Sequence, residues 1–185
     1  MAQMHYLISP SIFGDFGIVW RELADQPRIL RVTLPGKTRQ LEDTLRVEYP
    51  LAAEGAQPDT AALAGELRRF LNGEDVRFDL QWLAWETCTE FQSRVLQAEY
   101  GIPRGWVSTY GRIARELGVV GGGRAVGNAL ASNPFPLLIP CHRAVRSTGA
   151  LGGYQGGLEM KKALLEMEGV VFNSPTKASL IKVYY

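Results

Sequence analysis

The sequence has few of the residues that usually mark a metal site or a disulfide-stabilised fold. It holds two cysteines, Cys88 and Cys141, and two histidines, His5 and His142, among 185 residues. Two cysteines do not make the disulfide framework of a small secreted domain. These residues and the scattered carboxylates also lack the spacing of zinc ligands. We therefore expect no metal ion and no other cofactor.

Long apolar runs are missing as well. The first residues, MAQMHYLISP, do not lead from a basic stretch into an apolar one. No segment approaches the ~20 apolar residues that a membrane-spanning helix needs. We therefore expect no membrane association and a reducing, cytoplasmic setting.

Charge of one sign is not in excess either. The chain carries 20 basic and 19 acidic residues, a net charge of +1, so composition alone gives no sign of nucleic-acid binding. A hydrophobic share of 46% is that of an ordinary globular protein, with one core or two small ones. Basic residues do gather locally, opposed only by Glu116, at Arg104, Arg112, Arg115, Arg124, Arg143 and Arg146.

The first part of the chain predicts a small α/β domain. Residues 5–10, 16–20 and 29–34 are short, rich in β-branched or aromatic residues and separated by turn formers, which indicates strands. Residues 52–57 are small and polar, which favours a loop. A helix should begin at Pro58 and end at Asn72-Gly73, and the alternation in residues 76–80 favours a further strand.

The second part predicts mostly helices. One should begin near Thr89 and end at Gly101, and another should follow a cap at Ser108 or Thr109. Residues 124–132 and 158–169 continue the pattern, the latter with Leu158, Leu164 and Leu165 facing inward. Two short helices around a Gly-rich turn fit a helix-turn-helix, but spacing alone favours a plain helical hairpin. We expect domains at 1–86 and 87–172 and a tail at 173–185.

The block Pro140-Cys141-His142-Arg143 can carry nucleophilic chemistry. It follows the apolar residues 136–139, which should form a buried strand or extended segment that delivers the thiol to a pocket. A basic neighbour can lower the pKa of a thiol and so supply the nucleophilic thiolate. Sequence neighbours rarely point the same way, so a buried structural cysteine remains an alternative. A loop with five glycines, residues 148–157, follows and could bring backbone N–H groups close to a ligand.

Together these pieces resemble the O6-alkylguanine-DNA alkyltransferase family. The resemblance is dense from Phe91 to Gly169, through FQSRV, IPRGWVSTYGRIA, RAVGNALASNPFPLLIPCHR and GALGGYQGGLEMKKALLEMEG. It implies a mixed α+β or α/β fold, with an N-terminal RNase H-like domain and a C-terminal winged helix-turn-helix-like domain. It also implies a monomeric DNA-repair protein that flips O6-alkylguanine out of duplex DNA and alkylates itself once, with O4-alkylthymine as a further candidate substrate.

The resemblance also implies roles for individual residues. Cys141 is the alkyl acceptor, and His142, Glu168 and a water form its proton relay. Tyr110 binds the base and helps to protonate the departing guanine. Asn133 braces the active-site turn, and Arg124 takes the place of the flipped nucleotide in the duplex. The remaining implied contacts to base or DNA are Ser108, Thr109, Tyr154, Gln155 and Gly156.

Two alternatives stay open from the sequence. A binding-only relative would have lost the acceptor cysteine, whereas Cys141 is present. A Cys-His hydrolase would turn over a simple ester, whereas an alkyltransferase would stop after one reaction. One departure from the family pattern lies before Arg124, where Gly122 and Gly123 should each weaken the start of the helix by about 1 kcal/mol relative to Ala.

Overall fold

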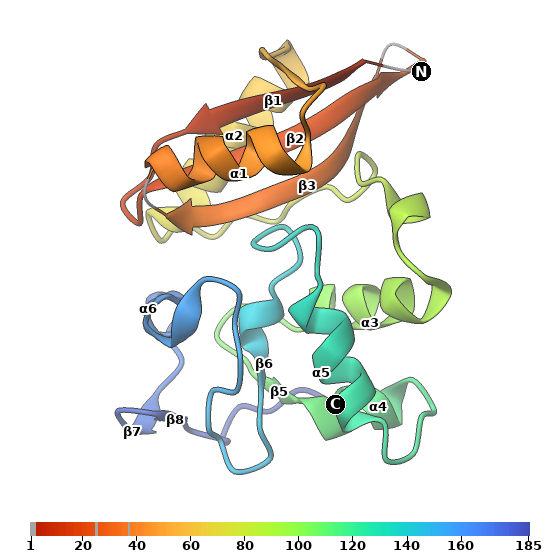
Figure 1. Cartoon of the computed structure of the whole chain (residues 1–185). Helices are drawn as coiled ribbons and strands as arrows, with labels where there is room; N and C mark the ends of the chain where they lie inside the picture. The colour runs from red at the N-terminus through yellow and green to blue at the C-terminus, as the bar shows by residue number, and fades with distance from the viewer. Residues whose placement is uncertain (1–2, 25, 37) are drawn as a thin grey trace. The chain divides into compact units, whose positions relative to one another are not determined.

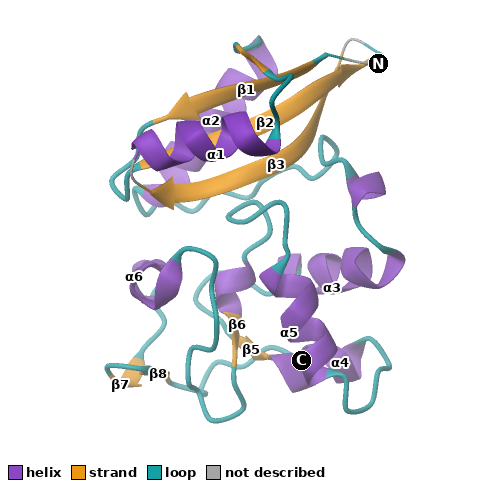
Figure 2. Ribbon diagram, in the orientation of Figure 1, coloured by secondary structure: helices purple, strands orange, loops and turns teal. Residues whose placement is uncertain are grey.

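The computed structural model describes residues 3–24, 26–36 and 38–185. The chain divides into two compact units (Figure 1). Unit 1 comprises Met1–Thr87 and Pro134–Leu138, and unit 2 comprises Cys88–Asn133 and Ile139–Tyr185. The fold is mixed α+β, with six α-helices and several small sheets in the described part (Figure 2).

Unit 1 is built on a four-stranded sheet in the order β3-β2-β1-β4. The strands β1 (Met4–Ser9), β2 (Asp15–Leu23) and β3 (Gln26–Gly36) form an antiparallel meander, which confirms the three strands predicted there. The predicted loop at 52–57 contains a short fourth strand, β4 (Ala53–Glu54), parallel to β1.

Two helices cover the two faces of this sheet (Figure 2). Phe16 to Trp20 on β2 are all buried, which a sheet covered on one face only would not allow. Helix α1 (Thr38–Glu48) packs Leu41 and Leu45 against Val19 and Tyr6. Helix α2 (Pro58–Leu71) lies behind the sheet in this view. It begins at Pro58 and ends at Leu71 before Asn72, as predicted.

Two expectations for extended segments were wrong. Val76–Leu80 forms no strand; Phe78 instead packs edge-on against Phe70, with ring centroids 5.6 Å apart. The apolar residues 136–139 form a turn with Leu137 at φ 73°, not a strand. Residues 134–138, which include most of this turn, belong with unit 1, where the Val32 N–H donates to the Pro134 carbonyl at 2.8 Å.

Unit 2 is mostly helical, and its helices begin where the sequence predicted. Helix α3 (Glu90–Tyr100) is capped by Thr89, whose side chain accepts from the Gln92 N–H, and α4 (Tyr110–Glu116) is capped in the same way by Thr109. Helix α5 (Gly123–Ala131) packs against both. Helix α6 (Gly157–Met167) buries Leu164 and Leu165 as predicted, but Leu158 is 51% exposed, contrary to expectation.

Short strands complete unit 2. Strands β5 (Ser108–Thr109) and β6 (Ala144–Val145) are parallel, and the 3-10 turn η2 (Cys141–Arg143) comes directly before β6. Residues 173–185, expected to be a tail, include most of β7 (Phe172–Ser174) and all of β8 (Lys177–Ala178). They also pair with Val107, whose N–H donates to Lys182 and whose carbonyl accepts from Tyr184. Among the described helices, none is long and apolar enough to cross a membrane.

Candidate active site

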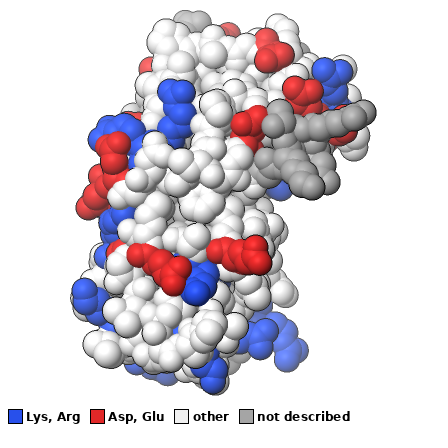
Figure 3. Space-filling view, turned by 90° about the vertical axis from the view of Figure 1, so that its left-hand side faces the viewer, with Lys and Arg blue, Asp and Glu red and all other residues white. Residues whose placement is uncertain are grey.

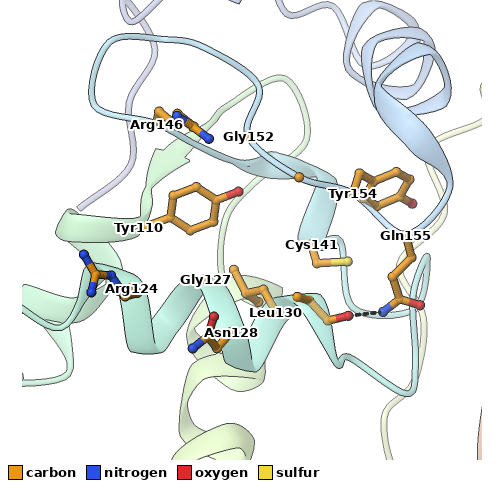
Figure 4. A pocket seen from close by; sticks show the side chains of 12 residues that line it. Tyr110, Arg124, Gly127, Asn128, Leu130, Cys141, Arg146, Gly152, Tyr154 and Gln155 are labelled. Atoms are coloured by element: carbon orange, nitrogen blue, oxygen red, sulfur yellow. Dashed lines mark hydrogen bonds between the residues drawn. The ribbon is translucent and has the colours of Figure 1, made fainter.

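Cys141 lines a cavity of about 390 Å³ within unit 2 (Figure 4). Tyr110 at the start of α4 and several residues of α5 form one wall. Arg146 and the loop from Gly152 to Gln155 form the other. The volume falls in the range of ~300–1,000 Å³ that is usual for small-molecule sites.

The Cys141 thiol is held in its neutral form. Cys141 is only 5% exposed, and burial raises the pKa of its thiol to about 12, although a hydrogen bond from the Asn133 side chain opposes that rise. The sequence had suggested that a basic neighbour lowers this pKa. In the folded chain burial outweighs that effect, so a base must remove the proton during the reaction.

Asn133 closes the turn that carries the cysteine. Its Nδ2 donates to the Ile139 carbonyl at 3.3 Å, and it is fully buried. The backbone carbonyl of Asn133 accepts a hydrogen bond from the Gln155 side chain at 2.9 Å. The same Gln155 amide donates to the backbone carbonyl of Ala131 at the end of α5 (Figure 4). Asn133 therefore sits where a bracing residue would be needed, and Gln155 ties the glycine loop to α5.

The two residues that follow Cys141 on η2, His142 and Arg143, form a buried cluster with Glu168. The Nε2 of His142 lies 2.8 Å from Glu168 Oε1, and Arg143 forms two hydrogen bonds of 2.8 Å with the same carboxylate. The side chains of His142 and Glu168 are completely buried. Arg143 also donates to the Ile102 carbonyl at 2.6 Å. Sequence reasoning had assigned no role to Arg143, because its partner lies 25 residues away.

The charges in this cluster follow from its burial. Burial would raise the pKa of Glu168, but His142 and Arg143 together lower it to about 2. Burial also lowers the pKa of His142, and the attraction of Glu168 does not reverse that direction. At neutral pH the imidazole is therefore uncharged, and Arg143 is the cation that balances Glu168. An Nε2–H donated to Glu168 makes Nδ1 the basic nitrogen.

Tyr110 and the glycine loop approach each other closely. A Cβ on Gly152 would lie 2.5 Å from the Tyr110 hydroxyl, and Gly152 has φ 71°, so only glycine fits there. Burial, with the charges of Glu99 and Cys141, raises the pKa of Tyr110 to about 12. The hydroxyl therefore stays protonated and able to donate. Tyr154 lies edge-on to His142, with ring centroids 6.3 Å apart.

The rim of the cavity is basic and exposed. Arg124, the second residue of α5, lies at one end of the cavity in Figure 4 and is exposed. Asn128, one helical turn later, and Arg146 also line the cavity, although sequence reasoning gave neither a role there. Two features of the sequence could have pointed to them: Asn128 lies four residues after Arg124, on the same face of a helix, and Arg146 belongs to the local group of arginines. Figure 3 shows further Lys and Arg side chains at the lower end of the drawn face.

Three predicted contact residues lie away from the cavity. Ser108 is fully buried and donates to the Tyr184 carbonyl at 2.7 Å, so its side chain is not positioned for DNA. Thr109 caps α4 and lines a second cavity of about 290 Å³ beside Arg112 and Arg115. Gly156 directly precedes α6 and does not line the cavity, whereas Gly152, Gly153, Tyr154 and Gln155 of the same loop do.

The described residues contain no group of three or more His, Cys, Asp or Glu that could hold a metal ion.

Comparison with known proteins gives the family. Residues 90–170 match the sequence model described as 6-O-methylguanine DNA methyltransferase, DNA binding domain. Methylated-DNA–protein-cysteine methyltransferase of Methanothermobacter thermautotrophicus is 42% identical over 167 residues, 90% of this chain and 83% of that protein. The Mycobacterium bovis protein of the same name is 44% identical over 163 residues, 87% of each chain.

A solved structure agrees with these relatives. The crystal structure of Mycobacterium tuberculosis OGT in complex with DNA aligns with a TM-score of 0.69 and 30% identity, over 89% of this chain and 92% of that one. The similarity thus extends through both units and is not confined to the cysteine block. The chain belongs to the methylated-DNA–protein-cysteine methyltransferase family.

Proposed function

We propose that this chain repairs DNA by moving an alkyl group from O6 of guanine to Cys141, once per molecule. The observation that carries the proposal is the position of Cys141: a neutral thiol that lines a cavity and lies on the same short turn, η2, as His142 and Arg143 of the buried cluster with Glu168. The cluster supplies what the thiol lacks, a neutral base whose protonated form is stabilised by a carboxylate.

The reaction would proceed as a displacement at carbon. The thiol proton of Cys141 passes through a water molecule to Nδ1 of His142, and Glu168 stabilises the imidazolium that forms. The sulfur then bonds to the alkyl carbon as the carbon–O6 bond breaks, and guanine leaves with the bonding electron pair. Tyr110, protonated at neutral pH, donates a proton to the departing base. His142 and Tyr110 then regain their resting states by proton exchange with solvent.

The thioether product accounts for a single turnover. Removing the alkyl group again would require the Cys141 thiolate to leave, and thiolate is a poor leaving group from an unactivated thioether. The cluster also holds a base rather than a second nucleophile. Each molecule would therefore act once, which distinguishes it from a Cys-His hydrolase, whose acyl-enzyme is released by water.

The depth of Cys141 requires the damaged nucleotide to leave the duplex. The thiol is 5% exposed, so a stacked base cannot reach it, and enzymes that modify bases inside a duplex extrude them for this reason. Arg124 lies exposed at the N-terminal end of α5, where it can fill the space that the nucleotide leaves. In this proposal α4, its turn and α5 act as a helix-turn-helix that docks on the minor groove.

The test is stoichiometric transfer. Duplex DNA with one O6-methylguanine is mixed with the protein, and intact-mass and peptide-mass spectrometry follow the added methyl group. We expect one methyl per molecule, on Cys141, and no further repair once it is consumed. Cys88→Ser serves as the matched control and should react normally. Repair beyond one equivalent, or methylation elsewhere, would overturn the proposal.

A further inference from the structure

Two buried ionisable side chains near Cys141 take no part in the relay. Glu99 on α3 and Lys161 on α6 are both completely buried. Both helices pack against η2, the turn that carries the cysteine. Fully buried carboxylates and ammonium groups are rare without a direct partner, because burial disfavours their charged forms.

Lys161 joins the cysteine turn to the glycine loop. Its Nζ donates to the carbonyls of Ala144 and Leu151 at 2.6 Å each and to that of Gly153 at 3.2 Å. Ala144 directly follows the Cys-His-Arg block, and Gly153 lines the cavity. All three acceptors are neutral. No carboxylate of the described residues lies within ion-pair distance of Lys161, so its charge stays uncompensated.

Glu99, unlike Lys161, is buried with few hydrogen bonds. Apart from the Ala144 N–H, whose effect on its pKa is the smallest, no hydrogen-bond donor of the described residues reaches its carboxylate oxygens. Burial raises the pKa of Glu99 to about 8, against the attraction of Lys161 and Arg143 and a smaller effect of the Ala144 N–H. Arg143 already balances Glu168, so it offers little to a second carboxylate. Burial likewise lowers the pKa of Lys161 to about 8.

Resting on the function proposed above, we propose that Glu99 and Lys161 form a proton-holding pair that tunes Cys141: Glu99 stays protonated at neutral pH, which leaves the Lys161 charge free to stabilise the thiolate. The two act on the thiol in opposite directions, since a charge on Lys161 lowers the pKa of Cys141 and a charge on Glu99 raises it. Both are positioning residues, because neither lines the cavity.

The pair predicts an alkaline loss of reactivity. Below about pH 8 the pair carries one net positive charge; above it one proton is lost, from either partner, and the net charge falls to zero. The thiolate then loses its stabilising field. The other ionisable groups with which Glu99 interacts are Arg143 and Cys141 on η2, Tyr110 on α4 and Tyr185 near the C-terminus. Burial raises the pKa of Cys141, Tyr110 and Tyr185, so these three stay protonated, and Arg143 is paired with Glu168.

The experiment measures thiol reactivity apart from DNA repair. The full chain with Cys88→Ser is alkylated by iodoacetamide between pH 6.5 and pH 9.5, and mass spectrometry follows Cys141. In a second arm, O6-benzylguanine replaces iodoacetamide. The variants are Glu99→Gln, which resembles the protonated carboxyl, and Glu99→Leu, which covers the case that the amide does not fold. Glu90→Gln, at an exposed position on the same helix, is the matched control.

We expect nearly equal rates in all proteins at pH 6.5. The rate of the parent should level off above about pH 8. In Glu99→Gln and Glu99→Leu the rate should level off at a lower pH, because these variants lack the carboxylate whose attraction raises the pKa of Lys161. Near pH 8 they should therefore be severalfold slower than the parent, since one unit in a thiol pKa changes the thiolate fraction about tenfold. Glu90→Gln should follow the parent. The inference would be overturned if the rate depended on pH in the same way in every variant. It would also be overturned if the Glu99 variants lost the same fraction of the rate at each pH, as a purely structural role predicts. Iodoacetamide profiles of the expected shape without any transfer from O6-benzylguanine would instead count against the proposed function.

Discussion

Replacing Glu168 by glutamine should destabilise the protein by about 3 kcal/mol at pH 7. The carboxylate has its pKa lowered from 4.5 to about 2 within the buried cluster. At about 1.4 kcal/mol per pKa unit, that difference gives about 3 kcal/mol, close to the cost of breaking a buried ion pair. Glutamine keeps the shape of the side chain but leaves Arg143 without its counter-ion.

The sign of the pH dependence is fixed by the same values. A carboxylate whose pKa is depressed in the folded state stabilises it fully above about pH 4.5 and loses that effect as the pH falls toward 2. The advantage of the parent over Glu168→Gln should therefore be constant from pH 7 to pH 5.5 and shrink to about 1.4 kcal/mol at pH 3.

Urea unfolding at these pH values measures the difference. Glu166→Gln is the matched control, because Glu166 lies in the last turn of α6, two residues before Glu168, and its side chain is 52% exposed. Among the described residues it forms an ion pair only with Lys162, at 3.5 Å. We expect it to cost at most about 0.5 kcal/mol. A Glu168→Gln protein as stable at pH 7 as this control would refute the reasoning, and so would a difference that does not shrink in acid. Single-turnover rates should show slower transfer in Glu168→Gln alone.

Three further substitutions separate binding, chemistry and shape. Cys141→Ala should abolish transfer yet leave the affinity for alkylated DNA nearly unchanged at one fixed salt concentration; a large loss of affinity would contradict this separation. Arg124→Ala should slow repair of duplex DNA far more than reaction with free O6-benzylguanine, and equal slowing would remove its proposed role. Gly152→Ala would place a Cβ 2.5 Å from the Tyr110 hydroxyl at φ 71°, so urea unfolding should show a loss of about 1–3 kcal/mol, with slower transfer; an unchanged protein would show that the loop yields.

Local rules predicted the helices of unit 2 and three strands of unit 1, but failed for two other extended segments. Thr89 and Thr109 mark helix starts because a cap is satisfied within three residues. Val76–Leu80 alternates like a strand, but a strand needs a partner, and no rule on sequence alone supplies one. No helix was predicted at Thr38–Glu48. Its two leucines, Leu41 and Leu45, make its contact with the sheet, and two apolar residues are too few to show a helical pattern.

The residues of the candidate site were likewise predicted only in part. The cysteine block, Tyr110 and the glycine loop were found from the chain's own motifs and their resemblance to a family. Glu99, Lys161 and the role of Arg143 were not found, because their partners come from distant parts of the chain: Arg143 donates to Ile102, 41 residues earlier, and Lys161 donates to Ala144, 17 residues earlier. In the sequence, a charged residue that becomes buried cannot be distinguished from one at the surface, because its partner is identified only in the folded chain.

The glycines before Arg124 show how position changes a propensity argument. The sequence assigned each of Gly122 and Gly123 a helix cost of about 1 kcal/mol. Gly122, however, is the residue before α5, and a Cβ there would lie 2.5 Å from the Val119 side chain, so alanine gains nothing. Gly123 is the first helical residue, and a Cβ there would meet the Gly111 backbone at 3.4 Å, an ordinary contact. We therefore expect Gly123→Ala to raise the free energy of unfolding by up to about 1 kcal/mol and Gly122→Ala to lower it. Urea unfolding of both variants measures these changes. Equal stabilisation by the two substitutions would contradict the prediction and show that the turn before α5 adjusts freely around Val119.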